Sequence, residues 1–109
     1  MLEALFGNIV VEKVLLFIFV YGDGYARKIS KVYGIPVNGV LQQLQRLENG
    51  GIIAGQNKGR TRLYMFNPRY PFLKELKGLL QRAIDVLPQA EIERYYRMRT
   101  RPRRKGKPV

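Results

Sequence analysis

Residues 24–66 read GYARKISKVYGIPVNGVLQQLQRLENGGIIAGQNKGRTRLYMF, and this stretch decides the fold. Apolar residues recur at helical spacing over about residues 25–33 and again over about 36–49. Gly34 between them suits the left-handed conformation that ends a helix, and Pro36 suits the first position of the next one. The stretch therefore predicts two helices joined by a tight turn.

A hairpin is expected after the second helix. Gly50 and Gly51 stop that helix, and residues 52–56 and 62–66 are typical of two short strands. Residues 57–59, Asn-Lys-Gly, form a turn signal between them. This order of elements places an exposed polar helix beside a cationic loop, the two parts that a small module needs to enter a DNA groove and hold its phosphates.

Another helix is expected before this block, over residues 9–21, with Asn8 as its N-cap. Its apolar residues almost encircle the axis, interrupted only by Glu12 and Lys13. A helix that is apolar all round is buried on more than one side. We interpret it as a core helix whose spare face meets a second subunit; the alternative is that the C-terminal helix covers that face within one chain.

The C-terminal part predicts a further helix over about residues 71–87, interrupted by Pro88, and a short helix over 89–98. The apolar positions of the longer helix are Phe72, Leu73, Leu76, Leu79, Leu80, Ala83, Ile84 and Leu87. The predicted fold class is mainly α with a small β-hairpin: three helices, the hairpin and a fourth helix. We expect one domain over residues 1–98, with a C-terminal dimerisation helix, and a disordered basic tail over 99–109.

Composition narrows the function classes. The chain has 109 residues with no cysteine or histidine, which excludes zinc fingers, thiolate chemistry and imidazole catalysis. Its net charge is +12, and most of the excess lies in residues 94–109, which favours a polyanionic partner. Residues 1–7 lack the positive charge of a secretory signal, and the longest apolar run, 14–21, is too short to span a bilayer. We therefore expect a cytoplasmic protein that is not an enzyme, with no cofactor, metal or membrane partner.

Candidate DNA-binding residues follow from this pattern. Asn and Gln can read adenine in the major groove, and the N-terminal half of a recognition helix faces the bases, so Asn38 and Gln42 are the candidates for base reading. Gly39 among them suggests a close backbone approach. The full predicted set is Arg27, Lys28, Asn38, Gly39, Gln42, Gln43, Arg46, Lys58, Arg60 and Arg62. The alternative interpretation of the same residues is an ordinary solvated helix face and a charged hairpin.

Residues 5–80 resemble winged helix–turn–helix regulators of the ArsR/MarR type from bacteria and archaea. The residues that carry the resemblance are Tyr25, Arg27, Ile29, Ser30, Gly34, Ile35, Val40, Leu44, Leu47, Gly51, Ile52 and Ile53, with 59–64 and Asn67-Pro68 in the wing. The resemblance implies sequence-specific binding of duplex DNA by a homodimer, usually to repress transcription. Pro36, Val37 and Gly39 depart from the small hydroxyl residues common at the start of the family's recognition helix.

The predicted subunit interface consists of Val10, Val14, Phe17, Leu76, Leu80 and Ile84. Two other function classes stay open from the sequence. One is a winged-helix module that binds a partner protein; the other is an RNA- or ribosome-associated basic protein, in which Tyr95 and Tyr96 stack on unpaired bases.

Overall fold

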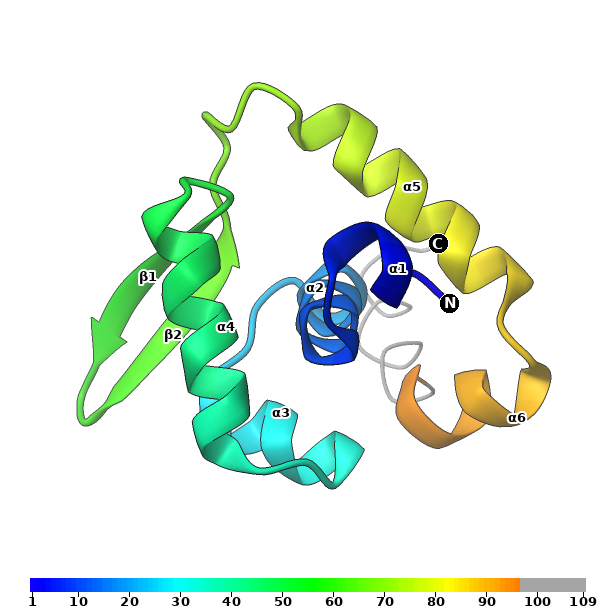
Figure 1. Cartoon of the computed structure of the whole chain (residues 1–109). Helices are drawn as coiled ribbons and strands as arrows, with labels where there is room; N and C mark the ends of the chain where they lie inside the picture. Colours follow the sequence, from blue (N-terminus) through cyan, green and yellow to red (C-terminus); the bar gives the residue numbers. More distant parts are fainter. Residues whose placement is uncertain (97–109) are drawn as a thin grey trace, which may run out of the picture.

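A computed structural model describes residues 1–96 (Figure 1). The predicted basic tail and Met98 lie outside the described residues. The elements are α1 (Glu3–Phe6), α2 (Ile9–Tyr21), α3 (Ala26–Tyr33), α4 (Val37–Asn49), β1 (Ile53–Lys58), β2 (Thr61–Phe66), α5 (Leu73–Val86), α6 (Gln89–Glu91) and a π-helical turn, η1 (Ile92–Tyr96). The predicted fold class, mainly helical with one antiparallel hairpin, is confirmed.

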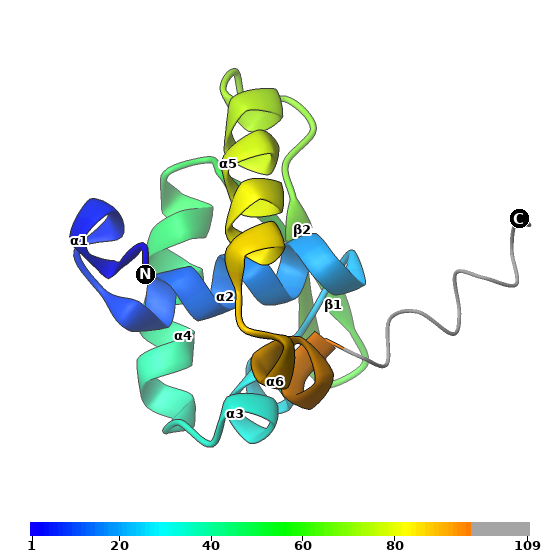
Figure 2. The same cartoon turned by 90° about the vertical axis from the view of Figure 1, so that its right-hand side faces the viewer.

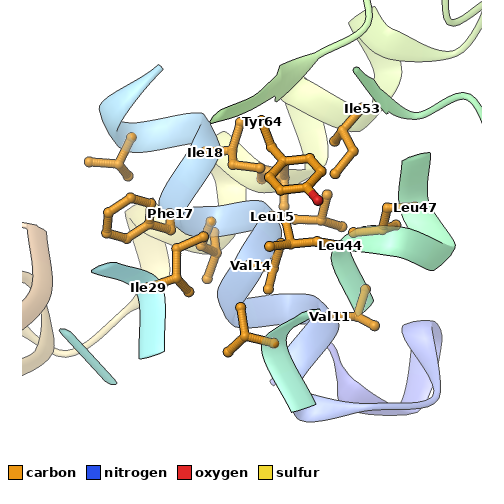
Figure 3. Close-up of a cluster of buried hydrophobic side chains, with 14 of the residues drawn as sticks. Val11, Val14, Leu15, Phe17, Ile18, Ile29, Leu44, Leu47, Ile53 and Tyr64 are labelled. Carbon is orange, nitrogen blue, oxygen red and sulfur yellow. The ribbon is translucent and has the colours of Figure 1, made fainter. Parts of the chain in front are cut away.

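Helix α2 is the centre of the molecule, with α3, α4 and α5 arranged around it (Figure 1). Asn8 caps it as predicted, because its side-chain oxygen accepts a hydrogen bond from the Val10 N–H at 2.6 Å. Side chains from α2, α3, α4 and the hairpin meet in one core (Figure 3). Leu80 and Ala83 of α5 belong to the same core, so the C-terminal helix covers part of α2 within one chain, which agrees with the alternative stated above.

This burial corrects part of the predicted subunit interface. Val14 and Leu80 are fully buried and Phe17 is 3% exposed within one chain. These three side chains belong to the core of a single chain, so the expectation that they meet a second subunit is wrong. Val10, from α2, and Leu76 and Ile84, from α5, are only half-buried.

The short helix α1 was not anticipated. It is held by a buried carboxylate, since Glu12 Oε1 accepts the Leu2 N–H at 2.7 Å and the Glu12 side chain is 7% exposed. Lys13, the other polar residue of α2, lies with its ammonium 4.9 Å from the ring centre of Tyr33 and 5.5 Å from that of Tyr95. Both polar residues of α2 thus have partners within the chain.

The turn between α3 and α4 forms as predicted, with one shift. Gly34 has a φ of 68° and ends α3 in the left-handed conformation. Pro36, however, is the N-cap residue and not the first residue of α4. Its ψ of 137° is extended, while its carbonyl already accepts the Val40 N–H at 3.3 Å.

The hairpin is tighter than predicted. Its ladder runs from Ile53 opposite Phe66 to Lys58 opposite Thr61, so Asn57 and Lys58 pair in the ladder and the predicted turn at 57–59 is wrong. Only Gly59 and Arg60 connect the strands, and Gly59 supplies the positive φ (62°) that such a short connection needs.

Helix α5 crosses over α2, and the C-terminal turn lies beside α3 (Figure 2). Leu80 and Ala83 form its buried face, and the helix ends at Val86, before Pro88, as predicted. Phe72 is 62% exposed and was wrongly placed on the apolar face. It precedes the helix as its N-cap residue and packs edge-on against Tyr70, with ring centres 5.8 Å apart.

Candidate nucleic-acid interface

The start of α3, the start of α4 and β2 with its preceding loop enclose one open groove of about 320 Å³. Its lining residues are Tyr25, Ala26, Arg27, Val37, Leu41, Arg60, Thr61, Arg62 and Tyr64. One arginine of α3, Arg27, and two of the hairpin, Arg60 and Arg62, therefore line a single groove beside the N-terminal end of the predicted recognition helix.

Most predicted cations of this face are exposed. Arg27 and Lys28 lie on α3, while Lys58 and Arg60 lie at the tip of the hairpin. Within residues 1–96, none of these four side chains forms an ion pair with an acidic residue. Their positive charge is consequently available to a polyanion.

Arg62 differs from the other cations because its guanidinium has three neighbours in the chain. Its Nη2 lies 2.5 Å from Glu48 Oε2, and its Nη1 donates to Asn57 Oδ1 at 2.8 Å. Its Cζ is 5.8 Å from the ring centre of Tyr64. The hydrogen bond that Arg62 donates to the Glu48 carboxylate raises the pKa of Arg62 above its ordinary value. Arg62, which was predicted to contact DNA phosphates, is thus held by contacts within the chain.

The outward face of α4 carries the predicted base-reading side chains. Asn38 and Gln42 are both exposed, one turn apart. Gln43 is half-buried and its Oε1 accepts a hydrogen bond from Arg46 Nη1 at 3.0 Å. Asn38 and Gln42 therefore present their amides to the solvent, while Gln43 and Arg46 partly satisfy each other.

Gly39 lies on the same helix, and a Cβ built there meets no heavy atom within 4 Å. Packing within the described chain does not require a glycine at this position. The space above its backbone is open to whatever contacts α4 from outside.

Sequence reasoning missed Glu48, Thr61 and Tyr25 as members of this region. The sequence could have indicated a role for Glu48, because it is the sole carboxylate between residues 24 and 66. Tyr25 precedes α3 as its N-cap residue and is 40% exposed at the groove. The place of Tyr25 at the groove depends on the backbone bridge between its neighbour Gly24 and Tyr64 of β2, a long-range pairing that the sequence pattern does not contain.

In residues 1–96, no three His, Cys, Asp or Glu side chains are close enough together to hold a metal ion. No helix within the same range has the length and apolar character needed to cross a membrane.

No model of a protein family and no curated protein matches the sequence. Solved structures do resemble it. A double mutant of ZitR from Lactococcus lactis in apo form is 14% identical over 95% of this chain and 89% of that one, with a TM-score of 0.54. A MarR-family transcriptional regulator from a Rhodococcus species is 14% identical over 98% and 80%, with a TM-score of 0.56.

The adhesin competence repressor of Streptococcus pyogenes is 13% identical over 95% of this chain and 87% of its own, with a TM-score of 0.52. At these identities the likeness is one of fold. It confirms the predicted winged helix–turn–helix, with α3 and α4 as the helix pair and β1 and β2 as the wing.

Proposed function

We propose that this chain, whose fold is that of winged-helix transcriptional regulators, binds duplex DNA sequence-specifically as a homodimer and represses transcription. The N-terminal half of α4 enters the major groove, and the tip of the wing holds the flanking backbone or the minor groove. The resemblance in fold to a MarR-family regulator and to a protein named a repressor supports this assignment.

One observation carries the proposal: Arg27 from α3 and Arg60 from the wing line a single groove beside the start of α4. Phosphate contacts fix the register of a protein on DNA, while base contacts provide specificity. The groove supplies cations for the first task. Asn38 and Gln42, exposed on α4, supply amides for the second.

The homodimer rests on apolar surface away from this groove. Leu5 of α1 is 65% exposed, Val86 at the end of α5 is 53% exposed, and Phe72 is 62% exposed. Leu5 and Leu76 also line a groove of about 540 Å³ between α1, α5 and the end of α4. Exposed apolar surface of this kind is a common feature of subunit contacts. In a two-fold dimer, the paired α4 helices would reach half-sites about 34 Å apart or multiples of that distance.

The dimer is tested by sedimentation equilibrium of the full chain. Leu5→Glu and Val86→Glu place charges on exposed positions and should shift the wild-type dimer toward monomer with little change in circular dichroism. A wild-type protein that sediments as a monomer at micromolar concentration would contradict this part of the proposal.

DNA binding is tested by competition among duplex DNA, single-stranded DNA and RNA for the full chain. The variant Arg27→Ala/Lys58→Ala/Arg60→Ala should lose most duplex binding. Arg69→Ala/Lys74→Ala/Arg82→Ala removes the same charge from exposed positions outside the groove and is the matched control. If 6–8 phosphates are neutralised per dimer, the slope of log K against log salt is about −5 to −7.

Equal losses in the two triple variants would mean that net charge alone, and not the groove, attracts DNA. Preference for RNA or single strands would favour the RNA-associated class. Binding of a partner protein that is unaffected by the first triple variant would favour the interaction module. Selection from random duplexes, followed by sequencing, identifies the operator and its half-site spacing.

A further inference from the structure

The wing and the recognition helix are joined by one ion pair. Residues 24–66 contain seven lysine and arginine residues and a single carboxylate, Glu48. Glu48 lies in the last turn of α4, and its carboxylate contacts Arg62 of β2. Strand β1 packs against α4 and pairs with β2, so the contact spans β1 (Figure 1).

We propose that Glu48 is a positioning and specificity residue: its carboxylate retains Arg62 inside the wing and thereby withholds that guanidinium from DNA phosphates. This inference rests on the proposed DNA binding. It divides the arginines of the wing into two kinds, with Arg60 contacting DNA and Arg62 fixing the orientation of the hairpin relative to α4.

The shape of β1 accommodates this arrangement. Asn57, which accepts from Arg62 Nη1, is opposite Arg62 in the ladder, and Gly55 is two residues further along the same face of β1. A Cβ on Gly55 would lie 2.5 Å from Arg62 Nε and 2.7 Å from its Cζ. The guanidinium therefore lies directly over the backbone of Gly55, in a space that a side chain at residue 55 would fill.

The partial exposure of the Glu48–Arg62 pair indicates that it adds little to folding stability. Its main effects are on the orientation of the hairpin and on the positive charge left free to bind DNA. The side chain of Arg62 is 39% exposed and that of Glu48 is 29% exposed. Pairs with this much exposure contribute little to folding free energy, because water and salt screen them. A charged pair at the edge of a binding groove does, however, determine which cations remain for the ligand.

The effect on DNA binding follows from counterion release. Each cation that neutralises a phosphate adds affinity irrespective of sequence. An arginine released into the groove would raise the affinity for every duplex. The ratio of the affinity for the specific site to the affinity for random DNA would therefore fall. A carboxylate that retains Arg62 favours discrimination over raw affinity.

The positioning role can be tested without DNA. In Glu48→Ala, proton exchange at the Nε–H of Arg62, followed by NMR, should be faster than in wild type, and amide exchange in β1 and β2 should also accelerate. Glu75→Ala removes one exposed carboxylate from the first turn of α5 and is the matched control. If the two variants show the same exchange as wild type, the positioning role is wrong.

The specificity role is tested by salt titrations against the selected operator and a random duplex of equal length. Glu48→Ala should steepen the slope of log K against log salt on the random duplex by about 0.9 per protomer, or about 1.8 for the homodimer, which is about a 12-fold greater loss of affinity over a fourfold rise in salt. Adding Arg62→Ala should return the slope to its wild-type value, since the released guanidinium causes the change.

A slope in Glu48→Ala that equals that of Glu75→Ala, or that Arg62→Ala does not reverse, would overturn the specificity role. Absence of any duplex binding by wild type would overturn the proposed function and the specificity role together. The exchange measurements on Arg62 would still decide the positioning role, so the two failures are distinguishable.

Discussion

Gly24 and Tyr64 exchange both of their backbone hydrogen bonds: the Gly24 N–H donates to the Tyr64 carbonyl at 3.0 Å, and the Tyr64 N–H donates to the Gly24 carbonyl at 2.8 Å. The connection between α2 and α3 thereby pairs with β2 like a short third strand. Because α3 starts two residues later, this bridge ties the wing to the helix pair.

Gly24→Ala should lower the free energy of unfolding by about 1–3 kcal/mol, because an added methyl group would overpack the core. A Cβ at residue 24 would lie 2.8 Å from Cε1 of Phe17 and 3.2 Å from Cδ1 of Ile29, both buried side chains. Urea unfolding followed by circular dichroism measures the change. Gly78→Ala, on the exposed face of α5 where a Cβ meets no atom within 4 Å, is the control and should not destabilise. An unchanged free energy of unfolding in Gly24→Ala would mean that the Gly24–Tyr64 bridge moves easily enough to accommodate the added Cβ.

The bridge also illustrates which parts of the fold the sequence predicts. Local signals were sufficient for the helices: the Asn8 cap, the left-handed Gly34 and the break at Pro88 all form as expected. Each of these three signals depends only on residues close by in the sequence. Within a helix, the spacing of the apolar residues indicates which face is buried. The predicted bounds of the longer helices were consequently close to those observed.

Contacts between distant residues could not be predicted in this way. Gly24 meets Tyr64, and Glu48 meets Arg62, only after the hairpin has folded back. The exposure of a candidate DNA-binding residue could be inferred from helical spacing. Whether its charge was already paired could not, because an ion pair depends on the register and angle of a second element.

Gly39→Ala separates stability from binding. Alanine should raise the free energy of unfolding by up to about 1 kcal/mol, since glycine is the poorer helix former and the added Cβ meets no atom of the chain. Gly78→Ala should give a similar gain. We expect DNA affinity to fall only for Gly39→Ala, because an added methyl group there would hold α4 away from the DNA. Equal DNA affinity in the two variants would show that DNA does not approach Gly39 closely.

Stability should decline at alkaline pH through two buried tyrosines. The hydroxyls of Tyr33 and Tyr96 lie 2.8 Å apart. Burial raises the pKa of Tyr96 to about 12 and also raises the pKa of Tyr33 above its ordinary value. Unfolded tyrosines ionise near pH 10, so above that pH the unfolded state binds fewer protons than the folded state. The two buried hydroxyls therefore make their full contribution to the free energy of unfolding below about pH 10, and this contribution is lost as the pH rises toward 12.

The measurement is urea unfolding at a series of pH values from neutral to strongly alkaline. Tyr33→Phe/Tyr96→Phe should flatten the decline, because phenylalanine does not ionise. Tyr25→Phe, in a side chain that is 40% exposed, controls for the removal of a tyrosine hydroxyl. A double variant with an unchanged alkaline decline would place the cause outside this pair.

The two exposed amides at the start of α4 should determine which sequence is bound. Asn38→Ala and Gln42→Ala are each expected to reduce the preference for the correct base pair by about 1–3 kcal/mol, because each removes a bidentate contact with one base. Gln45→Ala, on the exposed side of α4 nearer its C-terminal end, should have a smaller effect because the N-terminal half of such a helix faces the bases. Binding selections with each variant compare the preferences position by position. Uniform weakening across all sequences would instead assign Asn38 and Gln42 to the phosphate backbone, since contacts with phosphates carry no direct sequence information.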